Sequence, residues 1–130
     1  MSWRAGDTFT HISTPNLYPM PHLYFVISDA IEDSDEVVIV NLTSWRDKAD
    51  ETCILDVRDH PFVTHKSWIN YRDAKITTMK DLDKNENHPT IFRDASATNE
   101  LLRRIQKGAF TSVLTSPRIK EFLRERGLGT

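Results

Sequence analysis

A short polar segment between Asp59 and Tyr71 carries the densest group of side chains that can do chemistry. It supplies two imidazoles, an amine, a hydroxyl and a phenol, from His60, His65, Lys66, Ser67 and Tyr71. Imidazole titrates near pH ~6.5, so one ring can accept a proton at neutral pH while a second ring donates one. Cleavage of an RNA phosphodiester by its own 2′-hydroxyl needs this pair of transfers and no metal or cofactor. The segment therefore predicts acid–base chemistry at a phosphate.

Cationic and aromatic side chains nearby are candidates for holding the substrate. Lys66 or Arg46 could neutralise the extra negative charge that forms on the phosphate in the transition state. Trp45 lies in the polar stretch 43–48, so it is the tryptophan that we least expect to be buried, and it could stack on a base. We therefore expect Lys66, Arg46, Trp45 and Tyr71 to contact the substrate.

Two other interpretations of the histidines stay open. A histidine before proline, as His60 is, often serves only in a turn, where its ring bonds to nearby backbone. The second interpretation is a metal site, for which the candidate ligands are His22, Asp59, His60 and His65. The spacing of His60 and His65 matches no usual zinc motif and no cysteine pair supports it, so we expect no metal. A phosphate-binding glycine loop, a G-x-S-x-G elbow and an H-E-x-x-H helix are also missing from the sequence.

The elements that must position these side chains are mainly strands. Short runs that are rich in apolar residues and separated by turn residues predict strands over 6–12, 23–27, 37–42 and 52–57, and two more within 67–78. The two strands within 67–78 would be divided by a bend at 70–73. The run 37–42 is apolar on both faces, which is typical of a central strand. Five or six short strands predict a small barrel.

The C-terminal third is predicted to be helical after an exposed polar loop over 80–95. A first helix would be capped by Ser96 or Thr98 and ended by Gly108. A second would have Ser116 as N-cap, Pro117 as its first residue and Gly127 after its end. We expect one domain over 1–130, with a barrel in 1–79, the loop in 80–95 and a helical segment in 96–130.

Composition limits the class of protein. The chain has 130 residues, of which 38% are hydrophobic and 28% charged, with a net charge of -2, as in an ordinary globular domain. Its single cysteine, Cys53, lies in an apolar run and is expected to be a buried thiol in a reducing, cytoplasmic setting. No signal peptide or apolar span is apparent, so we expect no membrane association. Residues 96–130 hold seven Lys or Arg against three Glu, which suits either solvated helix faces or a surface for a polyanion.

Three stretches of the sequence resemble the PemK/MazF family of ribonuclease toxins. They are the opening Trp3–Asp7 with its Gly-Asp pair, the apolar strand 23–28 ending in Ser, and the strand 38–44 ending in Thr-Ser. The resemblance covers about residues 3–78. It implies an SH3-like barrel, a homodimer, an antitoxin partner and metal-independent cleavage of single-stranded RNA to a cyclic phosphate. It also implies that Thr43 stands at the family's catalytic Thr or Ser, whereas His22 stands where the family has a catalytic Arg.

The leading hypothesis is therefore a toxin-like endoribonuclease. His22, His60 or His65 would move protons, Lys66 would neutralise the phosphate, and Thr43 and Ser67 would position the scissile group. The alternative is a non-catalytic SH3-like module that binds a protein or nucleic acid. The two differ in geometry, because an enzyme needs His22 and residues 60–67 to converge on one concave site.

Overall fold

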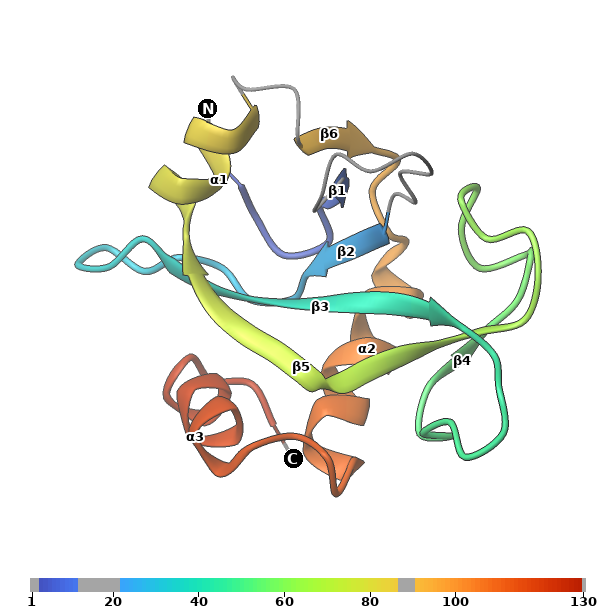
Figure 1. The fold of residues 1–130 in the computed structure, drawn as a ribbon. Coiled ribbons are helices and arrows are strands. Elements are labelled where there is room, and N and C mark those ends of the chain that lie inside the picture. Colours follow the sequence, from blue (N-terminus) through green and yellow to red (C-terminus); the bar gives the residue numbers. More distant parts are fainter. Residues whose placement is uncertain (1–2, 12–21, 87–90, 130) are drawn as a thin grey trace.

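The computed structural model describes residues 3–11, 22–86 and 91–129, and within them the chain is mainly antiparallel β-structure, as the sequence predicts. Six strands form one sheet in the order β4-β5-β3-β2-β1-β6, which curls into a half-barrel (Figure 1). The strands are β1 (Thr8–His11), β2 (His22–Val26), β3 (Glu36–Ser44), β4 (Ile54–Leu55), β5 (Ser67–Thr78) and β6 (Ile91–Asp94). The helices are α1 (Met79–Glu86), α2 (Asn99–Thr111) and α3 (Pro117–Glu125).

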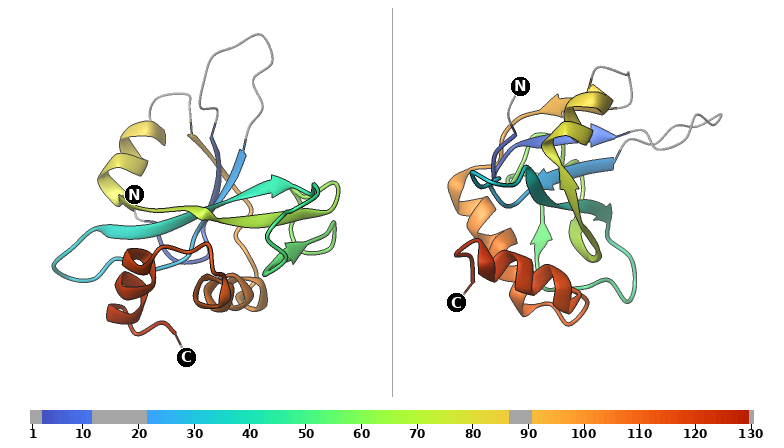
Figure 2. Two further views of the ribbon diagram at one scale, coloured as in Figure 1. Left: turned by 60° about the horizontal axis from the view of Figure 1, so that its bottom comes forward. Right: turned by 90° about the vertical axis from the view of Figure 1, so that its left-hand side faces the viewer.

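The central strand β3 buries apolar side chains on both sides, because the sheet is covered on both faces. Val38 and Val40 belong to the larger core, which includes residues of α2 and α3. Val37 and Ile39 belong to a smaller core with Trp3 and Leu82 of α1. Figure 2 shows the same layering, with α2 and α3 together on one side of the long strands β3 and β5, and α1 on the other.

The segment 67–78 is one continuous strand, so the predicted division into two strands is wrong. The signal at 70–73 marks a bulge instead. Ile39 pairs with Lys75 and Asn41 pairs with Asn70, so β5 has extra residues opposite this part of β3. The Asn70 side-chain amide donates to Asp73 Oδ2 at 2.8 Å across the bulge. A bulge bends the strand and increases its twist, which is how β5 follows the curl of the sheet.

The prediction of an exposed loop over 80–95 is wrong for the residues that the structure describes there. Residues 79–86 form α1 and 91–94 form the edge strand β6. The helix is polar on most sides, but Leu82 is buried in the smaller core, as is Ile91 of β6. At the start of α1, the Thr78 hydroxyl accepts a hydrogen bond from the Asp81 amide at 3.0 Å. The Trp3 indole also donates to Asp83 at 2.9 Å, so contacts with distant parts of the chain accompany the cap where the sequence shows only polarity.

The C-terminal helices begin at side-chain caps. Thr98 accepts from the Leu101 amide at the start of α2, and Ser116 accepts from the Ile119 amide at the start of α3. The expectation that Gly108 ends the first helix is wrong, since α2 continues to Thr111. Gly108 is required for packing instead: a Cβ there would overlap the Tyr71 hydroxyl and lie 2.9 Å from Tyr71 Cζ. Within the described ranges, the structure contains no helix of the length and apolar character that crossing a membrane requires.

Candidate functional site

A pocket of about 490 Å³ opens where the start of β2, the end of β3 and the loop before β5 meet. We name it the His22–His65 pocket. Leucine, phenylalanine and valine side chains make up its apolar part, and its polar part includes four residues that the sequence singles out: His22, Thr43, His65 and Ser67. Side chains from three distant parts of the chain thus line one concave surface.

Antiparallel pairing explains why these residues meet. The last residues of β3 lie beside the first residues of β5, with Thr43 opposite Trp68 and Ser44 opposite Ser67. On the other side of β3, Tyr24 pairs with Asn41, and the same register continued by two residues brings His22 of β2 opposite Thr43. Since paired residues point to the same side of a sheet, the His22 and Thr43 side chains share one face.

His65 is held in a chain of hydrogen bonds with two hydroxyl groups. Its Nε2 lies 2.8 Å from Ser44 Oγ, and its Nδ1 lies 3.0 Å from Thr64 Oγ1. The Trp68 indole donates to the Ser44 carbonyl at 3.0 Å, which fixes the end of β3. Ser44 is a pocket residue that the sequence analysis does not select. The signal that could have found it is the strand register, which places it opposite Ser67.

Ser67 shapes the pocket from a buried position. It is 4% exposed, and its hydroxyl donates to the His65 carbonyl at 2.9 Å. This bond closes the turn that presents the His65 ring. Ser67 therefore lines the pocket with its hydroxyl already engaged by the backbone.

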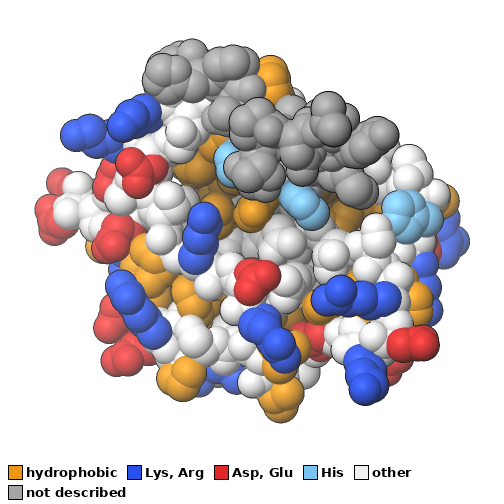
Figure 3. All heavy atoms as spheres, in the orientation of Figure 1, with side chains coloured by type: hydrophobic (Ala, Val, Ile, Leu, Met, Phe, Trp, Pro, Cys, Tyr) orange, Lys and Arg blue, Asp and Glu red, His pale blue; other side chains and the backbone are white. Residues whose placement is uncertain are grey.

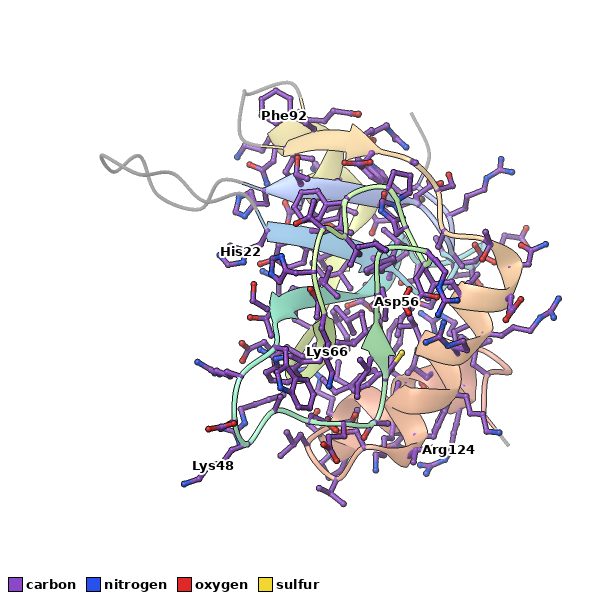
Figure 4. All side chains as sticks on the ribbon, turned by 90° about the vertical axis from the view of Figure 1, so that its right-hand side faces the viewer. His22, Lys48, Asp56, Lys66, Phe92 and Arg124 are labelled. Atoms are coloured by element: carbon purple, nitrogen blue, oxygen red, sulfur yellow. The ribbon has the colours of Figure 1, made fainter. Side chains whose placement is uncertain are left out.

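Lys66 and Trp45 form a pair beside this turn. The Lys66 ammonium lies 3.8 Å from the centroid of the Trp45 ring, and the Trp45 amide donates to the Lys66 carbonyl at 3.1 Å. Both Lys66 and the neighbouring Arg46 are exposed. Figure 4 shows His22 at the edge of the strands, Arg124 among the C-terminal helices and Lys66 between the two. The arrangement offers two cations and one half-buried aromatic ring to solvent.

His60 does not join the pocket. It is 2% exposed, its Nε2 donates to the Ala95 carbonyl at 2.6 Å, and its Nδ1 accepts from the Phe62 amide at 3.1 Å. The ring also packs edge-on against Phe25, with the centroids 5.8 Å apart. Both nitrogens are occupied by backbone groups, so His60 has the structural role that a histidine before proline often has.

Tyr71 is also placed away from the pocket. Its side chain is fully buried in the larger core, and its hydroxyl donates to the Ile105 carbonyl of α2 at 2.8 Å. Burial strongly raises the pKa of the Tyr71 phenol. The expectation that Tyr71 contacts substrate is therefore wrong, because the sheet buries alternate residues of β5 and this one points toward α2.

A second pocket, of about 400 Å³, adjoins the first at His22. We name it the Asp73 pocket. Its other lining residues are Tyr24, Asn41, Asp73 and Lys75. In Figure 3, histidine side chains gather on this face of the molecule, with Lys or Arg and Asp or Glu side chains below them. Of the residues of this pocket, only His22 is among those predicted from the sequence.

His11 lies next to the Asp73 pocket, because it pairs with His22 in the β1–β2 ladder. Burial lowers the pKa of the His11 imidazole, and the positive charges of Lys75 and His22 lower it further. Its ring lies edge-on to Tyr24, with the centroids 6.1 Å apart. Three histidines, His11, His22 and His65, therefore border this part of the surface.

Other candidate chemistry is absent from the described residues or is engaged elsewhere. In residues 3–11, 22–86 and 91–129, no group of three or more His, Cys, Asp or Glu side chains is arranged to hold a metal ion. Cys53 is buried and burial raises the pKa of its thiol, which leaves it a poor nucleophile.

Several basic side chains of the C-terminal segment have partners within the protein. Arg104 forms a salt bridge with Asp59 at 2.7 Å and donates to the Ile54 carbonyl at 2.8 Å. Arg126 lies 4.1 Å from the Phe122 ring centroid, and Arg124 lies 5.6 Å from that of Phe110. These contacts give three of the seven basic side chains a role in the packing of the protein itself, and leave the other four open to either interpretation.

Comparison with known proteins adds no relative: no protein-family model matches the chain, and no curated protein matches its sequence.

Proposed function

We propose that this protein is a metal-independent endoribonuclease that cleaves single-stranded RNA in the His22–His65 pocket. The single observation that carries the proposal is that His22 and His65, from distant parts of the chain, line the same pocket. Attack by a ribose 2′-hydroxyl needs a base on one side of the phosphate and an acid on the other. Two imidazoles around one pocket match that need.

Each remaining residue has a role that fits its position. The Ser44 and Thr64 hydroxyls orient the His65 ring through their hydrogen bonds to its two nitrogens. Thr43, on the same face as His22, is placed to hydrogen-bond a phosphate oxygen. Lys66, with its ammonium over the Trp45 ring, supplies positive charge, and Trp45 supplies a surface on which a base can stack. His60 and Tyr71 have no part in the proposal.

The biological setting of the proposal comes from the sequence resemblance. Similarity to PemK/MazF toxins suggests that the curled sheet is an SH3-like fold, that the protein forms a homodimer and that an antitoxin protein controls it. It also gives His22 the position of a catalytic arginine, and in the proposal a histidine there replaces the arginine in handling the phosphate.

The test is cleavage of a labelled single-stranded RNA by the purified protein in excess chelator. We expect fragments that end in a 2′,3′-cyclic phosphate, and no cutting where the ribose before the scissile phosphate is replaced by 2′-deoxyribose. His22→Ala and His65→Ala should each lower the rate by about 10² to 10⁴-fold. Arg118→Ala, an exposed change on α3, is the matched control and should keep the wild-type rate.

Intact RNA after long incubation with the wild-type protein contradicts the proposal. RNA that is bound but uncut would favour the alternative, a non-catalytic binding module. Induced expression supplies a second test, because an active ribonuclease toxin should arrest growth of the host and the His22→Ala variant should not.

A further inference from the structure

The Asp73 pocket is lined by polar groups whose hydrogen-bonding capacity the fold leaves unused. Asp73 accepts one hydrogen bond, from Asn70 to its Oδ2, and its Oδ1 has no hydrogen-bond partner among the described residues. Over the same residues, the Asn41 side-chain amide, the Lys75 ammonium and the Tyr24 hydroxyl also form no hydrogen bond or salt bridge. Polar groups that converge on one concave surface without partners are the usual mark of a binding site.

The pocket also has a rigid aromatic wall. The Tyr24 ring stacks on Phe9, with centroids 5.2 Å apart and planes inclined by 5°. Phe9 in turn packs edge-on against Trp3 at 5.4 Å, and both Phe9 and Trp3 are buried. This stack holds the Tyr24 ring in place before a ligand binds. A flat ligand beside the ring can therefore bind with little free-energy cost for ordering the protein.

We propose that the Asp73 pocket binds a guanine base of the RNA, next to the phosphate that His22 and His65 act on. The inference rests on the proposed function, because it names one base of the RNA that is cleaved in the His22–His65 pocket. His22 lines both pockets, so the two adjoin, and in this proposal a base bound in one has its neighbouring phosphate at the other.

The pattern of donors and acceptors selects guanine among the four bases. Guanine alone presents two adjacent donors, N1–H and the N2 amine, which a carboxylate such as Asp73 accepts together. Adenine and cytosine present an acceptor beside their amine, and uracil has one N–H between two carbonyls. Lys75 stands two residues after Asp73, on the same face of β5, and can donate to guanine O6. The Asn41 amide is a further donor or acceptor for the base edge.

The test is binding of oligonucleotides that cannot be cleaved. The probes are fluorescein-labelled 2′-O-methyl uridine tracts with one central guanine, inosine or adenine, titrated with the protein while anisotropy is measured. We expect guanine to bind about tenfold tighter than adenine, as one bidentate base contact gives. Inosine, which lacks the N2 amine, should bind with intermediate affinity.

Two variants locate the preference. Asp73→Asn should bring guanine to within about twofold of adenine, because an amide offers only one acceptor. Asp33→Asn, an exposed carboxylate in the connection between β2 and β3, is the matched control and should keep the tenfold preference. Lys75→Gln should weaken guanine binding with little effect on adenine. The thermal unfolding of each variant is measured alongside, to separate loss of a contact from loss of the fold.

Equal binding of guanine and adenine by the wild-type protein overturns the inference, as does a preference that Asp73→Asn leaves unchanged. The outcomes also separate the two proposals. RNA cleavage without guanine preference contradicts this inference alone, and guanine-selective binding without cleavage contradicts the proposed function alone. Failure to bind any of the oligonucleotides contradicts both.

Discussion

Two regions of this molecule use polar side chains in opposite ways. In the region packed under α2, the polar groups are engaged by the backbone: His60 contacts Ala95 and Phe62, Tyr71 donates to Ile105, and Gln106 donates to the Ile27 carbonyl at 2.9 Å. In the Asp73 pocket, the side chains of Asn41 and Lys75 and the Tyr24 hydroxyl have no hydrogen-bond partner among the described residues.

The difference shows why residue type alone does not identify a site. A buried polar group without a partner costs free energy, which explains why His60, Tyr71 and Gln106 are bonded to backbone groups. At a solvent-facing pocket, water satisfies the same groups until a ligand replaces it. The polar residues of the packed region should therefore matter for stability, and those of the pockets for binding or rate.

The largest change in stability is expected from Gly108→Ala in the packed region. The added Cβ meets the Tyr71 ring and hydroxyl, and overpacking of this kind costs about 1–3 kcal/mol in the free energy of unfolding. Chemical denaturation measures it. In a Tyr71→Ala background the same change should cost nothing, because the obstacle is gone and alanine favours the helix. An equal cost in both backgrounds would show that Tyr71 is not the reason for the glycine.

A smaller effect separates two tyrosine hydroxyls. Tyr71→Phe removes a buried hydrogen bond to the Ile105 carbonyl and should lower the free energy of unfolding by about 1 kcal/mol. Tyr24→Phe is the matched change in the Asp73 pocket, where the hydroxyl has no hydrogen-bond partner within the described part of the chain, and it should leave stability unchanged. Equal losses from the two variants would contradict the comparison.

Removing the Lys66 charge should affect RNA binding and leave the fold intact. An exposed lysine that contacts a phosphate contributes about one unit to the slope of binding against salt concentration. Lys66→Ala should therefore weaken binding and reduce that slope, with an unfolding midpoint like that of the wild-type protein. Lys84→Ala, an exposed lysine of α1, should change neither quantity. An unaltered salt slope in Lys66→Ala removes this residue from the substrate contacts.

The subtlest effect concerns pH and His11. Burial, then Lys75 and His22, lower the pKa of His11 in the folded protein. The unfolded chain therefore binds a proton at His11 more tightly than the folded protein does. The stability that neutral His11 contributes is present above pH ~6.5 and is lost as the pH falls toward the lowered pKa of the folded protein. The unfolding midpoint of the wild-type protein should fall more than that of His11→Asn between about pH 7.5 and about pH 5.5, which lie about one unit either side of the ordinary imidazole pKa. Parallel pH profiles would contradict the assignment.

Local sequence signals predicted much of the fold. Short apolar runs between turn residues found β1, β2 and β3, and Ser116 followed by Pro117 marks the start of α3 because both act within one helical turn. The same method missed α1, whose stability comes from Leu82 packing on a core that Trp3 and Val37 provide from elsewhere in the chain. It also divided β5 at residues that form a bulge, since a turn and a bulge use similar residue types.

The candidate site was predictable in part. His22, Thr43, His65 and Ser67 were selected and the fold brings them to one pocket. His60 was selected for its residue type, but its burial depends on the Ala95 carbonyl 35 residues away. The Asp73 pocket was missed because it arises from the register of β2, β3 and β5, and no short stretch of sequence contains it.

The most direct test of the division into packed and pocket residues compares two histidines of one loop. His65→Ala should lower the rate of RNA cleavage by about 10²-fold or more, with an unchanged free energy of unfolding. His60→Ala should lower that free energy by about 2 kcal/mol, because it leaves the Phe62 amide and Ala95 carbonyl without their partner, and the rate per folded molecule should stay as in the wild type. The reverse pattern, with His60 controlling the rate and His65 the stability, would contradict the account.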